Sequence, residues 1–354
     1  MTVRIAVTGA SGFCGGVTAL AAASAGAHVI CLGRRPGPVG EFRYWDAAAR
    51  TPPDLTGTDI VLHLAAAVGD PPPGRAAEAA FRAVNVDGAA HLLAAAESRK
   101  TVWVSSASVY ATAGPDPIRE DHPLSGMTAY GRTKAAGERL ALAAGAVVLR
   151  PRAVYGHGDP HLLPRLRRAV RGGRALLPGP DVPLSLTAVE NLADACLAAA
   201  GLPAEAGLPS EAGLTSEAGL TSEAGLTSEA GLPAAAAPGR RHENHAGRPD
   251  ETAMGWPAGA YNIADAEPYQ RDQVVEAVCG VPVRHLPIPL ATAAATLATA
   301  IAHVTGLPAT LSRYAVQQLT SGVILDISRA RAQGWTPRRT LTDFLSETRS
   351  TRTS

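Results

Sequence analysis

Short apolar runs recur along the first half of the chain, and they predict buried strands. The runs are Val3–Val7, His28–Leu32, Phe42–Trp45, Asp59–Ala67 and Ala146–Arg150, with one more leading into the serine-containing stretch Val104–Tyr110. Between them, apolar residues at helical spacing predict helices over Val17–Ala25, Arg75–Glu97 and Ser125–Ala144. The pattern therefore predicts strands that alternate with helices, except before Phe42, where too few residues are left for a crossover helix.

The apolar pattern continues in the second half, on either side of an irregular segment. Before that segment, Leu162–Arg171 predicts a helix, and Ser185–Ala200 predicts a strand that leads into a helix. The elements expected after it are a strand at Gly259–Ile263, a helix at Arg271–Val278, an Ala/Thr-rich helix and a final helix from near Thr340, with the segments Val283–Leu286 and Leu311–Leu319 also in the C-terminal part of the fold.

The irregular segment contains an internal repeat. The hexapeptide Glu-Ala-Gly-Leu-Thr-Ser occurs three times at Glu211–Ser228, with near-copies on either side. A six-residue period fits neither a helical face nor a strand, and its Ala and Gly residues do not suit the inward row of a solenoid. Residues 202–257 are therefore predicted to be a low-complexity, disordered insertion. Its His242, Glu243 and His245 lack the supporting residues of a metal site, so no metal is expected.

Composition and charge exclude several classes of protein. A chain of 354 residues, 46% of them hydrophobic, can bury a full core, and a formal net charge of +1 gives no reason to expect nucleic acid as a partner. The four cysteines are scattered, which favours a reducing compartment over a disulfide framework. The chain enters a strand pattern at once, so no signal peptide is expected and a cytoplasmic location is predicted.

The nearly uncharged stretch Leu286–Ser312 raises the question of a membrane span. It consists mostly of alanine and threonine, and prolines and a glycine interrupt it. A packed helix, with no membrane partner, is the better interpretation of this composition.

A glycine-rich turn follows the first strand. Three glycines in a G-x-x-G-x-x-G pattern stand directly before the first helix. Such glycines let a phosphate approach the backbone, and the free N–H groups at the start of the helix attract it. The turn therefore predicts a dinucleotide site, although a glycine-rich turn also occurs where a strand and a helix only pack tightly. The predicted residues are Gly9, Ser11, Gly12, Phe13 and Gly15.

The ends of the next two strands bear on which dinucleotide binds. An acidic residue after His28–Leu32 would bind the adenosine ribose hydroxyls, but Arg34 and Arg35 stand there instead. Two arginines offer positive charge to a 2′-phosphate, which favours NADP over NAD; alternatively, they belong to a solvated loop. Asp46, at the end of the following strand, is expected to accept a hydrogen bond from the adenine amino group.

Tyr130 and Lys134 lie four residues apart on a predicted helix, so they project from the same face. A phenol is a weak acid at neutral pH, and a nearby ammonium stabilises its anion and lowers its pKa. A hydroxyl such as Ser106 would hold a carbonyl or alkoxide oxygen against the phenol. These residues predict a site that moves a proton on a carbon-bound oxygen while a dinucleotide carries the hydride.

Other residues near strand ends are expected to line the cofactor and the substrate. Small residues at the end of Asp59–Ala67 let a cofactor approach the backbone, and the segment after Ala146–Arg150 would form the floor of the nicotinamide pocket. The predicted cofactor residues here are Leu64, Ala65, Ala66, Ser105, Pro151, Ala153 and Val154, besides Tyr130 and Lys134. The predicted substrate residues are Ala67, Ser106, Ser108, Arg152 and His157. Asn85 is expected to brace neighbouring backbone, and His63 to be a satisfied core histidine.

Together these motifs resemble the extended short-chain dehydrogenase/reductase superfamily, in its NAD(P)-dependent epimerase/dehydratase group. The resemblance rests on Thr8–Gly15, His63–Ala66, Asn85–Gly88, Ser105–Tyr110, Tyr130–Lys134, Leu149–Pro151 and Val154–Gly156, which follow one another in the family's order. It implies an α/β fold with a Rossmann-type doubly wound parallel sheet and a small C-terminal substrate lobe. Residues 1–201 would form the NAD(P)-binding domain, with a lobe segment from about 152, and 258–354 the lobe and closing helices.

The resemblance also implies roles for the central residues. Tyr130 would be the general acid/base, and Lys134 would bind the nicotinamide ribose and tune Tyr130. Ser106 would orient the substrate oxygen, with Ser108 as the rival for that role.

The second half of the chain resembles the 3β-hydroxysteroid dehydrogenase-like branch of this superfamily. The similar segments are Val189–Ala195, Thr305–Pro308, Asp326–Ser328 and Ala330–Arg331. Nucleotide-sugar members usually carry an arginine just before the first of these, and Leu184–Ala188 contains none. That departure weakens a nucleotide-sugar substrate, unless Arg152, Arg165 or Arg313 serves instead.

Three functions follow as hypotheses. The first is an oxidoreductase that transfers hydride between the nicotinamide and a ketone or secondary alcohol of a small molecule. The second is a nucleotide-sugar epimerase or dehydratase that uses the same residues through a transient oxidation. The third is a non-catalytic NADP-binding sensor, against which the retained Tyr130 and Lys134 argue. A homodimer is expected, through a four-helix bundle of Arg75–Glu97 and Met127–Ala144 from each copy.

Overall fold

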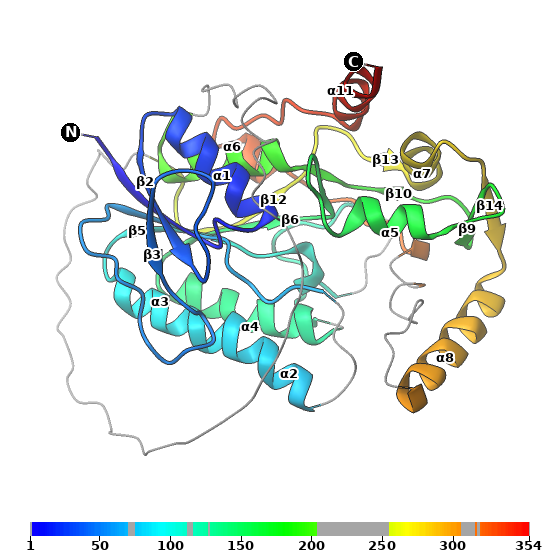
Figure 1. The fold of residues 1–354 in the computed structure, drawn as a ribbon, viewed down its shortest axis with the longest axis horizontal. Helices are drawn as coiled ribbons and strands as arrows, with labels where there is room; N and C mark the ends of the chain where they lie inside the picture. The colour runs from blue at the N-terminus through cyan, green and yellow to red at the C-terminus, as the bar shows by residue number, and fades with distance from the viewer. Residues whose placement is uncertain are drawn as a thin grey trace. The chain divides into compact units, whose positions relative to one another are not determined.

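The fold of the chain is given by a computed structural model (Figure 1). It describes residues 2–69, 75–111, 116–126, 128–203, 255–305, 316 and 319–353. The repeat Glu211–Ser228, with most of the predicted insertion, lies outside the described residues, as does most of Leu311–Leu319. The predicted disorder of the insertion and its three possible metal ligands therefore stay predictions.

Seven parallel strands form the central sheet. They are β1 (Arg4–Thr8), β2 (His28–Gly33), β3 (Glu41–Tyr44), β4 (Ile60–His63), β5 (Lys100–Val104), β6 (Val147–Pro151) and β12 (Gly259–Ile263). Their order across the sheet is β12-β6-β5-β4-β1-β2-β3. The chain moves outward from β1 through β2 to β3 and then returns to β4 on the other side of β1. Open α/β sheets bind ligands at such a reversal, beyond the carboxyl ends of the strands. The predicted Rossmann-type sheet is confirmed.

Helices cover both faces of the sheet (Figure 1). The helices α1 (Phe13–Ser24) and α6 (Val189–Ala200) pack together on one face, and α3 (Ala89–Ala96) packs with α4 (Ala129–Ala143) on the other. Alternate residues of each strand feed the two cores, as the period of a strand requires. Ile5 and Val7 join the core with Leu192, whereas Ala6 joins the core with Leu92 and Trp103.

The helix predicted over Arg75–Glu97 is interrupted. It begins as α2 (Arg75–Arg82), passes through a π-helical turn at Ala83–Gly88 and continues as α3. A π turn inserts an extra residue into the helical ladder and often marks a functional site. Here it contains the buried Asn85.

A second group of elements packs around its own apolar cluster. It contains α5 (Leu162–Arg168), α7 (Arg271–Cys279), α11 (Leu341–Thr353), and a small sheet of β8 (Val170–Arg171), β9 (Arg174–Pro178) and β14 (Val283–Leu286). The helix predicted over Leu162–Arg171 thus ends early, and its last residues start a strand. Two short strand pairs complete the fold: β7 (Val154–Tyr155) with β11 (Thr187–Ala188), and β10 (Pro183–Leu184) with β13 (Tyr269–Gln270). The division at 201 and 258 into two domains stays a prediction.

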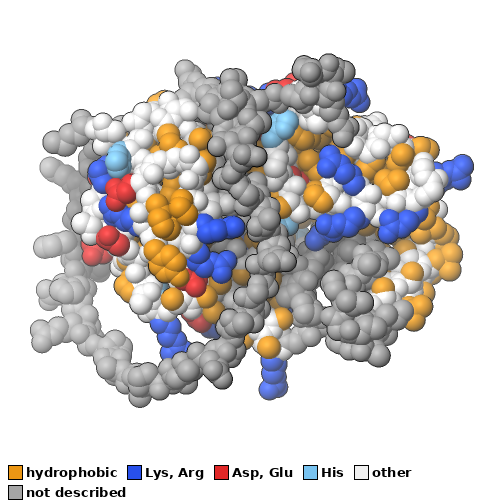
Figure 2. Space-filling view, in the orientation of Figure 1, with side chains coloured by type: hydrophobic (Ala, Val, Ile, Leu, Met, Phe, Trp, Pro, Cys, Tyr) orange, Lys and Arg blue, Asp and Glu red, His pale blue; other side chains and the backbone are white. Residues whose placement is uncertain are grey.

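The uncharged stretch Leu286–Ser312 begins as predicted with a helix, α8 (Ile288–Thr305). Within the ranges that the structure describes, no helix has the length and apolar character needed to cross a membrane. Leu290 and Leu297 of α8 are exposed. On the face of the molecule seen in Figure 2, basic side chains occur singly or in small groups among hydrophobic and uncharged atoms. The short helix α10 (Ser328–Arg331) follows Asp326, whose Oδ1 accepts from the Ser328 N–H.

Candidate active site

The glycine-rich turn between β1 and α1 fits a phosphate group. Gly9 has φ +71°, a left-handed conformation, and a Cβ atom there would lie 2.8 Å from the Ala65 nitrogen. A Cβ on Gly15 would lie 2.2 Å from the Gly9 oxygen, so the helix packs directly on the turn. Gly12 occupies the N-cap of α1, and no side chain caps the helix there. The first N–H groups of α1 therefore lack a side-chain partner and are available to an anion.

The end of β4 is tied to this turn by Thr8. The Thr8 Oγ1 atom accepts from the Leu64 and Ala65 N–H groups, each at 3.1 Å. It also pairs with Nδ1 of the buried His63 at 2.8 Å, while the other ring nitrogen, Nε2, is buried without a hydrogen-bond partner. Burial lowers the pKa of His63 well below its ordinary value, so the ring is neutral. His63 is thus a core histidine, but only one of its nitrogens is satisfied.

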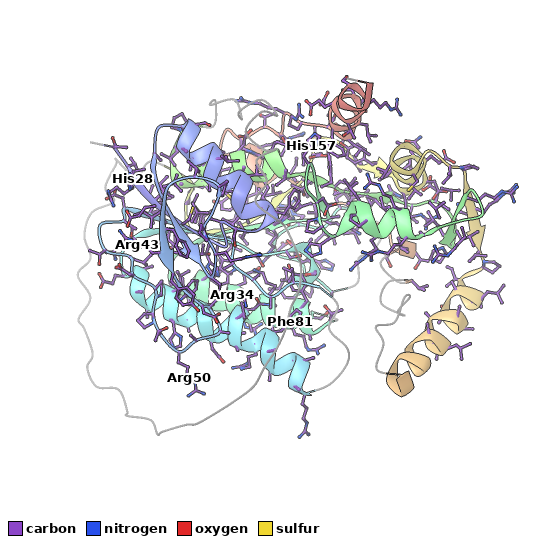
Figure 3. The ribbon with its side chains drawn as sticks, in the orientation of Figure 1. His28, Arg34, Arg43, Arg50, Phe81 and His157 are labelled. Carbon is purple, nitrogen blue, oxygen red and sulfur yellow. The ribbon has the colours of Figure 1, made fainter. Side chains whose placement is uncertain are left out.

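Arg34, Arg35 and Asp46 follow two neighbouring strands. Gly33 of β2 pairs with Tyr44 of β3, which brings the residues after both strands to the same edge of the sheet. Both arginines are exposed there, and Figure 3 labels Arg34. Asp46 is half-buried, and its Oδ1 accepts from the Ala48 N–H at 3.0 Å.

The helix α4 carries Tyr130 and Lys134, as its sequence predicts. Thr128 caps it by accepting from the Gly131 N–H at 3.0 Å. A Cβ on Gly131 would lie 2.4 Å from the Ser108 oxygen, so only glycine lets the first turn of α4 approach the serine segment this closely. The structure therefore brings the turn that contains Tyr130 beside Ser108.

Lys134 is buried, with 2% of its surface exposed, and its Nζ donates to the Val104 carbonyl oxygen at 2.7 Å. The same nitrogen lies 5.3 Å from the centre of the Trp103 ring. Burial lowers the pKa of Lys134 to about 8, and the charge of Glu138 opposes that shift. The lysine is therefore held at the end of β5, one helical turn after Tyr130.

The three predicted serines have different partners. Ser108 donates to the Ser106 Oγ atom from its N–H at 3.2 Å and from its hydroxyl at 2.9 Å, and both serines are half-buried. The Ser105 hydroxyl instead donates to Glu138 Oε2 at 2.5 Å. Ser106 and Ser108 thus form a hydroxyl pair, while the side chain of Ser105 turns into the protein.

Asn85 joins three segments around the site. Its Oδ1 accepts from the Ala67 N–H at 2.8 Å, and its Nδ2 donates to the Ala67 oxygen and to Thr133 Oγ1 of α4. The prediction that this amide braces neighbouring backbone is confirmed. Ala67, a predicted substrate residue, is thereby fixed next to α4.

The segment after β6 has an unusual backbone. Ala153 has φ +45°, a conformation that costs a non-glycine residue energy and that clusters at functional sites. The Arg152 N–H donates to Thr187 Oγ1 at 3.1 Å, which fixes the segment to β11. His157 packs against Phe344 of α11, with ring centres 5.0 Å apart, and lies 3.8 Å from Glu347 Oε2 (Figure 3). These contacts link His157 to α11, and its predicted substrate role stays a prediction.

A buried polar network behind α4 was missed by the sequence analysis. Arg150 donates to Glu138 from Nε at 3.1 Å and to the Tyr110 hydroxyl at 2.7 Å, and that hydroxyl donates to Asn262 Oδ1 at 2.6 Å. One signal was present in the sequence: Glu138 lies four residues after Lys134, so it shares the buried face of the helix.

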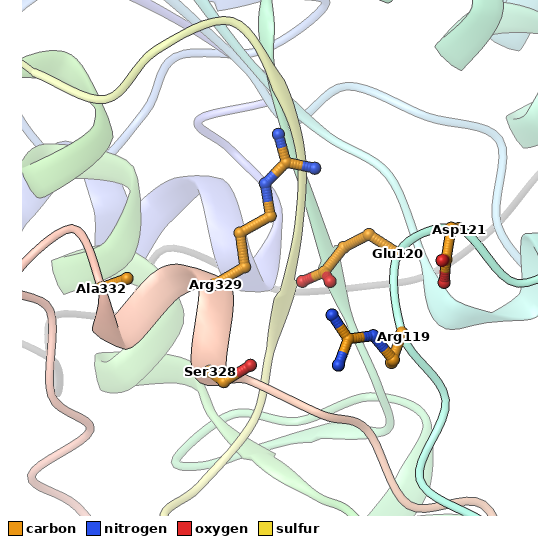
Figure 4. Close-up of a pocket in the computed structure, with 6 residues that line it drawn as sticks. All are labelled: Arg119, Glu120, Asp121, Ser328, Arg329 and Ala332. Carbon is orange, nitrogen blue, oxygen red and sulfur yellow. The ribbon is translucent and has the colours of Figure 1, made fainter.

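A surface pocket of about 450 Å³ contains none of the predicted site residues. It is lined by Arg119, Glu120, Asp121, Ser328, Arg329 and Ala332 (Figure 4). Arg119 lies 3.7 Å from Asp326, and Arg329 lies over the Tyr261 ring at 4.8 Å. Both arginines are already engaged, so no ligand is assigned to this pocket.

Comparison with known families supports the same interpretation. The model of the NAD dependent epimerase/dehydratase family matches residues 5–210, which include the glycine-rich turn and the Tyr130/Lys134 helix. The chain belongs to this family. The resemblance inferred from the spaced motifs is therefore confirmed.

Two relatives of different substrate class are similar to part of the chain. It is 33% identical over 209 residues to dTDP-4-dehydrorhamnose reductase of Streptomyces griseus, a match that covers 56% of this chain and 66% of the relative. It is 32% identical over 157 residues to a decarboxylating sterol-4-alpha-carboxylate 3-dehydrogenase of Candida albicans, covering 40% of this chain and 43% of the relative. The second fits the 3β-hydroxysteroid dehydrogenase-like branch. The chain thus spans less than two thirds of the length of these relatives.

A solved structure extends the likeness over the whole fold. A short-chain dehydrogenase/reductase superfamily protein from Agrobacterium tumefaciens, with bound NAD, has a TM-score of 0.65 and 19% identity. The match covers 99% of this chain and 97% of that one. At this identity the likeness concerns the fold.

Proposed function

We propose that this chain is an NAD(P)-dependent oxidoreductase that transfers hydride between the nicotinamide and a ketone or secondary alcohol of a small molecule. The observation that carries the proposal is the fixed position of Lys134, whose ammonium lies on the Val104 oxygen one helical turn after Tyr130. Membership of a family named for NAD dependence supports the proposal, and so does the presence of both Tyr130 and Lys134.

Tyr130 is the general acid of the proposed reaction in the reducing direction. Its phenol gives a proton to the carbonyl oxygen while the carbonyl carbon receives hydride, so the ketone becomes a secondary alcohol. When bound, the reduced nicotinamide supplies that hydride and becomes oxidised. The Lys134 ammonium stabilises the phenolate that remains, and the Ser106 or Ser108 hydroxyl donates to the substrate oxygen. In the oxidising direction each transfer is reversed.

The dinucleotide is proposed to lie along the carboxyl ends of β1, β4, β5 and β6. Its pyrophosphate would lie on the turn formed by Gly9, Ser11, Gly12, Phe13 and Gly15. Leu64, Ala65, Ala66, Ser105, Pro151, Ala153 and Val154 would line the rest of its path. The uncapped start of α1 supports this placement, because it leaves backbone N–H groups available to an anion.

NADP is the proposed form of the cofactor. Arg34 and Arg35 are exposed at the end of β2, where a 2′-phosphate would lie, and Asp46 at the end of β3 would accept from the adenine amino group.

The second candidate is a nucleotide-sugar epimerase or dehydratase. The family name favours it, and the similarity to dTDP-4-dehydrorhamnose reductase favours a nucleotide-sugar substrate, although a reductase has the chemistry of the first candidate. Against it stands Leu184, which occupies β10 and pairs with Tyr269 in the region where nucleotide-sugar enzymes usually carry an arginine. We therefore place it second.

A screen of substrates separates the two candidates. The purified protein is assayed with steroid ketones, β-keto acids and dTDP- and UDP-4-keto sugars, each with NADPH and NADH, and with dTDP- and UDP-hexoses without added cofactor. The proposal expects net consumption of an exchangeable cofactor, one equivalent for each ketone reduced. Oxidised cofactor that stays bound through purification, with a nucleotide sugar converted and no net cofactor change, would support the second candidate instead. A protein that binds neither dinucleotide would contradict both.

The proposed setting is the cytoplasm, with the protein as a homodimer. The interrupted helix of α2 and α3 lies beside α4 on one face of the sheet, where these two helices and their copies would form a four-helix bundle (Figure 1). Sedimentation at micromolar concentration tests this, and a monomer would contradict it.

A further inference from the structure

The face of α4 that carries Tyr130 and Lys134 continues to Glu138, one turn further on. Glu138 is fully buried, with 0% of its surface exposed. A buried carboxylate is costly unless charged or hydrogen-bonding partners surround it. Glu138 therefore requires an explanation of what holds it and what it does.

Two side chains donate to the two oxygens of the Glu138 carboxylate. The Ser105 hydroxyl at the end of β5 donates to Oε2 at 2.5 Å, and Arg150 of β6 donates to Oε1 from Nε at 3.1 Å and from a second nitrogen, Nη2. Arg150 is itself 2% exposed, and it also donates to the Glu120 carbonyl oxygen at 2.9 Å. The carboxylate is thus held by Ser105, directly after β5, and by Arg150 of β6.

Besides Glu138, few groups could stabilise the positive charge of the buried Lys134. It is buried, and its Nζ donates to the neutral carbonyl oxygen of Val104. The titratable groups that face it are Tyr130 and Glu138 from its own helix and His63 from β4. His63 is neutral, since burial depresses its pKa. Among the residues that the structure describes, Glu138 is the negative charge that acts on this lysine, and it raises the pKa that burial lowers.

We propose that Glu138 is a positioning residue of the active site, held by Arg150 and Ser105 so that Lys134 stays protonated beside Tyr130. The proposal deepens the proposed function and rests on it for the role of the lysine. The Glu138 carboxylate connects the serine segment to α4: it bonds to Ser105, which is next to Ser106, and it lies on the same helix as Tyr130 and Lys134. A structural ion pair between Glu138 and Arg150 would not require the lysine to respond to it.

The lysine content of the chain permits a direct measurement. The chain has two lysines, Lys100 and Lys134. The full chain, labelled with ¹³C at the lysine ε carbon, is titrated without cofactor or substrate by NMR. Lys100→Arg assigns the two signals, and in the other samples the Lys100 signal serves as the internal reference.

Glu138→Gln keeps the shape of the side chain and removes its charge. The proposal expects the Lys134 midpoint to fall by about one pH unit or more, a tenfold change in its acid dissociation constant, while Lys100 is unchanged. Glu138→Asp, which restores the charge, should recover at least part of the shift. Asp194→Asn removes a half-buried carboxylate from α6 and should leave the Lys134 midpoint in place.

An unchanged or raised Lys134 midpoint in Glu138→Gln would overturn the proposal. If that variant does not fold, Glu138→Gln with Arg150→Gln leaves no charge of the pair buried alone, and the Lys134 midpoint should again fall, by less than in the single variant because the positive charge of Arg150 is also removed. Because the titration uses neither substrate nor cofactor, its result is independent of the substrate screen. If no substrate is converted but the Lys134 midpoint shifts in Glu138→Gln, the proposed reaction is refuted and the role of Glu138 is retained. If a ketone is reduced but the midpoint does not shift, the proposed reaction is retained and the role of Glu138 is refuted.

Discussion

Lys134 donates from Nζ to the carbonyl oxygen of Val104 at 2.7 Å, which ties the helix α4 to the carboxyl end of β5. The bond fixes the ammonium where the sheet opens toward the glycine-rich turn. It also places the lysine one helical turn from Tyr130, on the same face of α4. The proposed chemistry depends on this placement, because a phenol trades a proton near neutral pH only when its anion is stabilised.

Activity is predicted to fall as the pH rises through the pKa of Lys134. Burial lowers that pKa to about 8, so the protonated form dominates below pH 8 and is lost above it. A profile of kcat against pH should therefore lose activity on its alkaline side from about this value. Lys134→Arg keeps the charge at higher pH and should move the alkaline limb upward, at reduced overall rate. An alkaline limb that Lys134→Arg leaves unmoved would show that another group sets it.

Gly9→Ala is predicted to abolish dinucleotide binding and to destabilise the fold. The new Cβ would lie 2.8 Å from the Ala65 nitrogen in addition to the strain of φ +71°. Gly26→Ala is a matched control, because Gly26 has φ +82° and nothing within 4 Å of a Cβ. Each variant should lose about 1–2 kcal/mol from backbone strain, measured by denaturant unfolding. Only Gly9→Ala should also lose binding in calorimetric titration with NADPH, and equal binding in both variants would contradict the placement of the pyrophosphate.

The double variant Arg34→Gln with Arg35→Gln is predicted to lose the preference for NADPH. Removal of two charges near a 2′-phosphate should raise the dissociation constant for NADPH by about tenfold or more and leave that for NADH nearly unchanged. Arg284→Gln, on the exposed part of β14, is the control for charge removal. If the double variant binds both cofactors as the wild type does, these arginines are only a solvated loop.

Much of the fold could be predicted from the sequence, because strands of a parallel sheet are buried on both faces and appear as apolar runs. Apolar character and strand hydrogen bonding do not always end at the same residue. The run Asp59–Ala67 continues beyond β4, which ends at His63, because small residues line the edge of the sheet without extending the ladder. The π turn at Ala83–Gly88 was missed, since the insertion of one residue barely changes a helical pattern.

Some features of the candidate site could be predicted from the sequence, and others could not. Tyr130 and Lys134 could be paired from the sequence because helical spacing is local. The link from Tyr110 to Asn262 joins residues 152 positions apart and the link from Arg150 to Glu138 joins two elements, so no local spacing reveals them. His157 was expected at the substrate, and its contact with Phe344 of α11 likewise depends on distant parts of the chain.

The most direct test of the proposed chemistry is a single-turnover measurement of NADPH oxidation by Tyr130→Phe with the best ketone from the screen. The account predicts that hydride transfer slows by at least about 100-fold, because the proton donor is gone. NADPH affinity should stay close to that of the wild type, and Tyr44→Phe, at an exposed position of β3, should keep the wild-type rate. Reduction of the ketone by Tyr130→Phe at the wild-type rate would contradict the account.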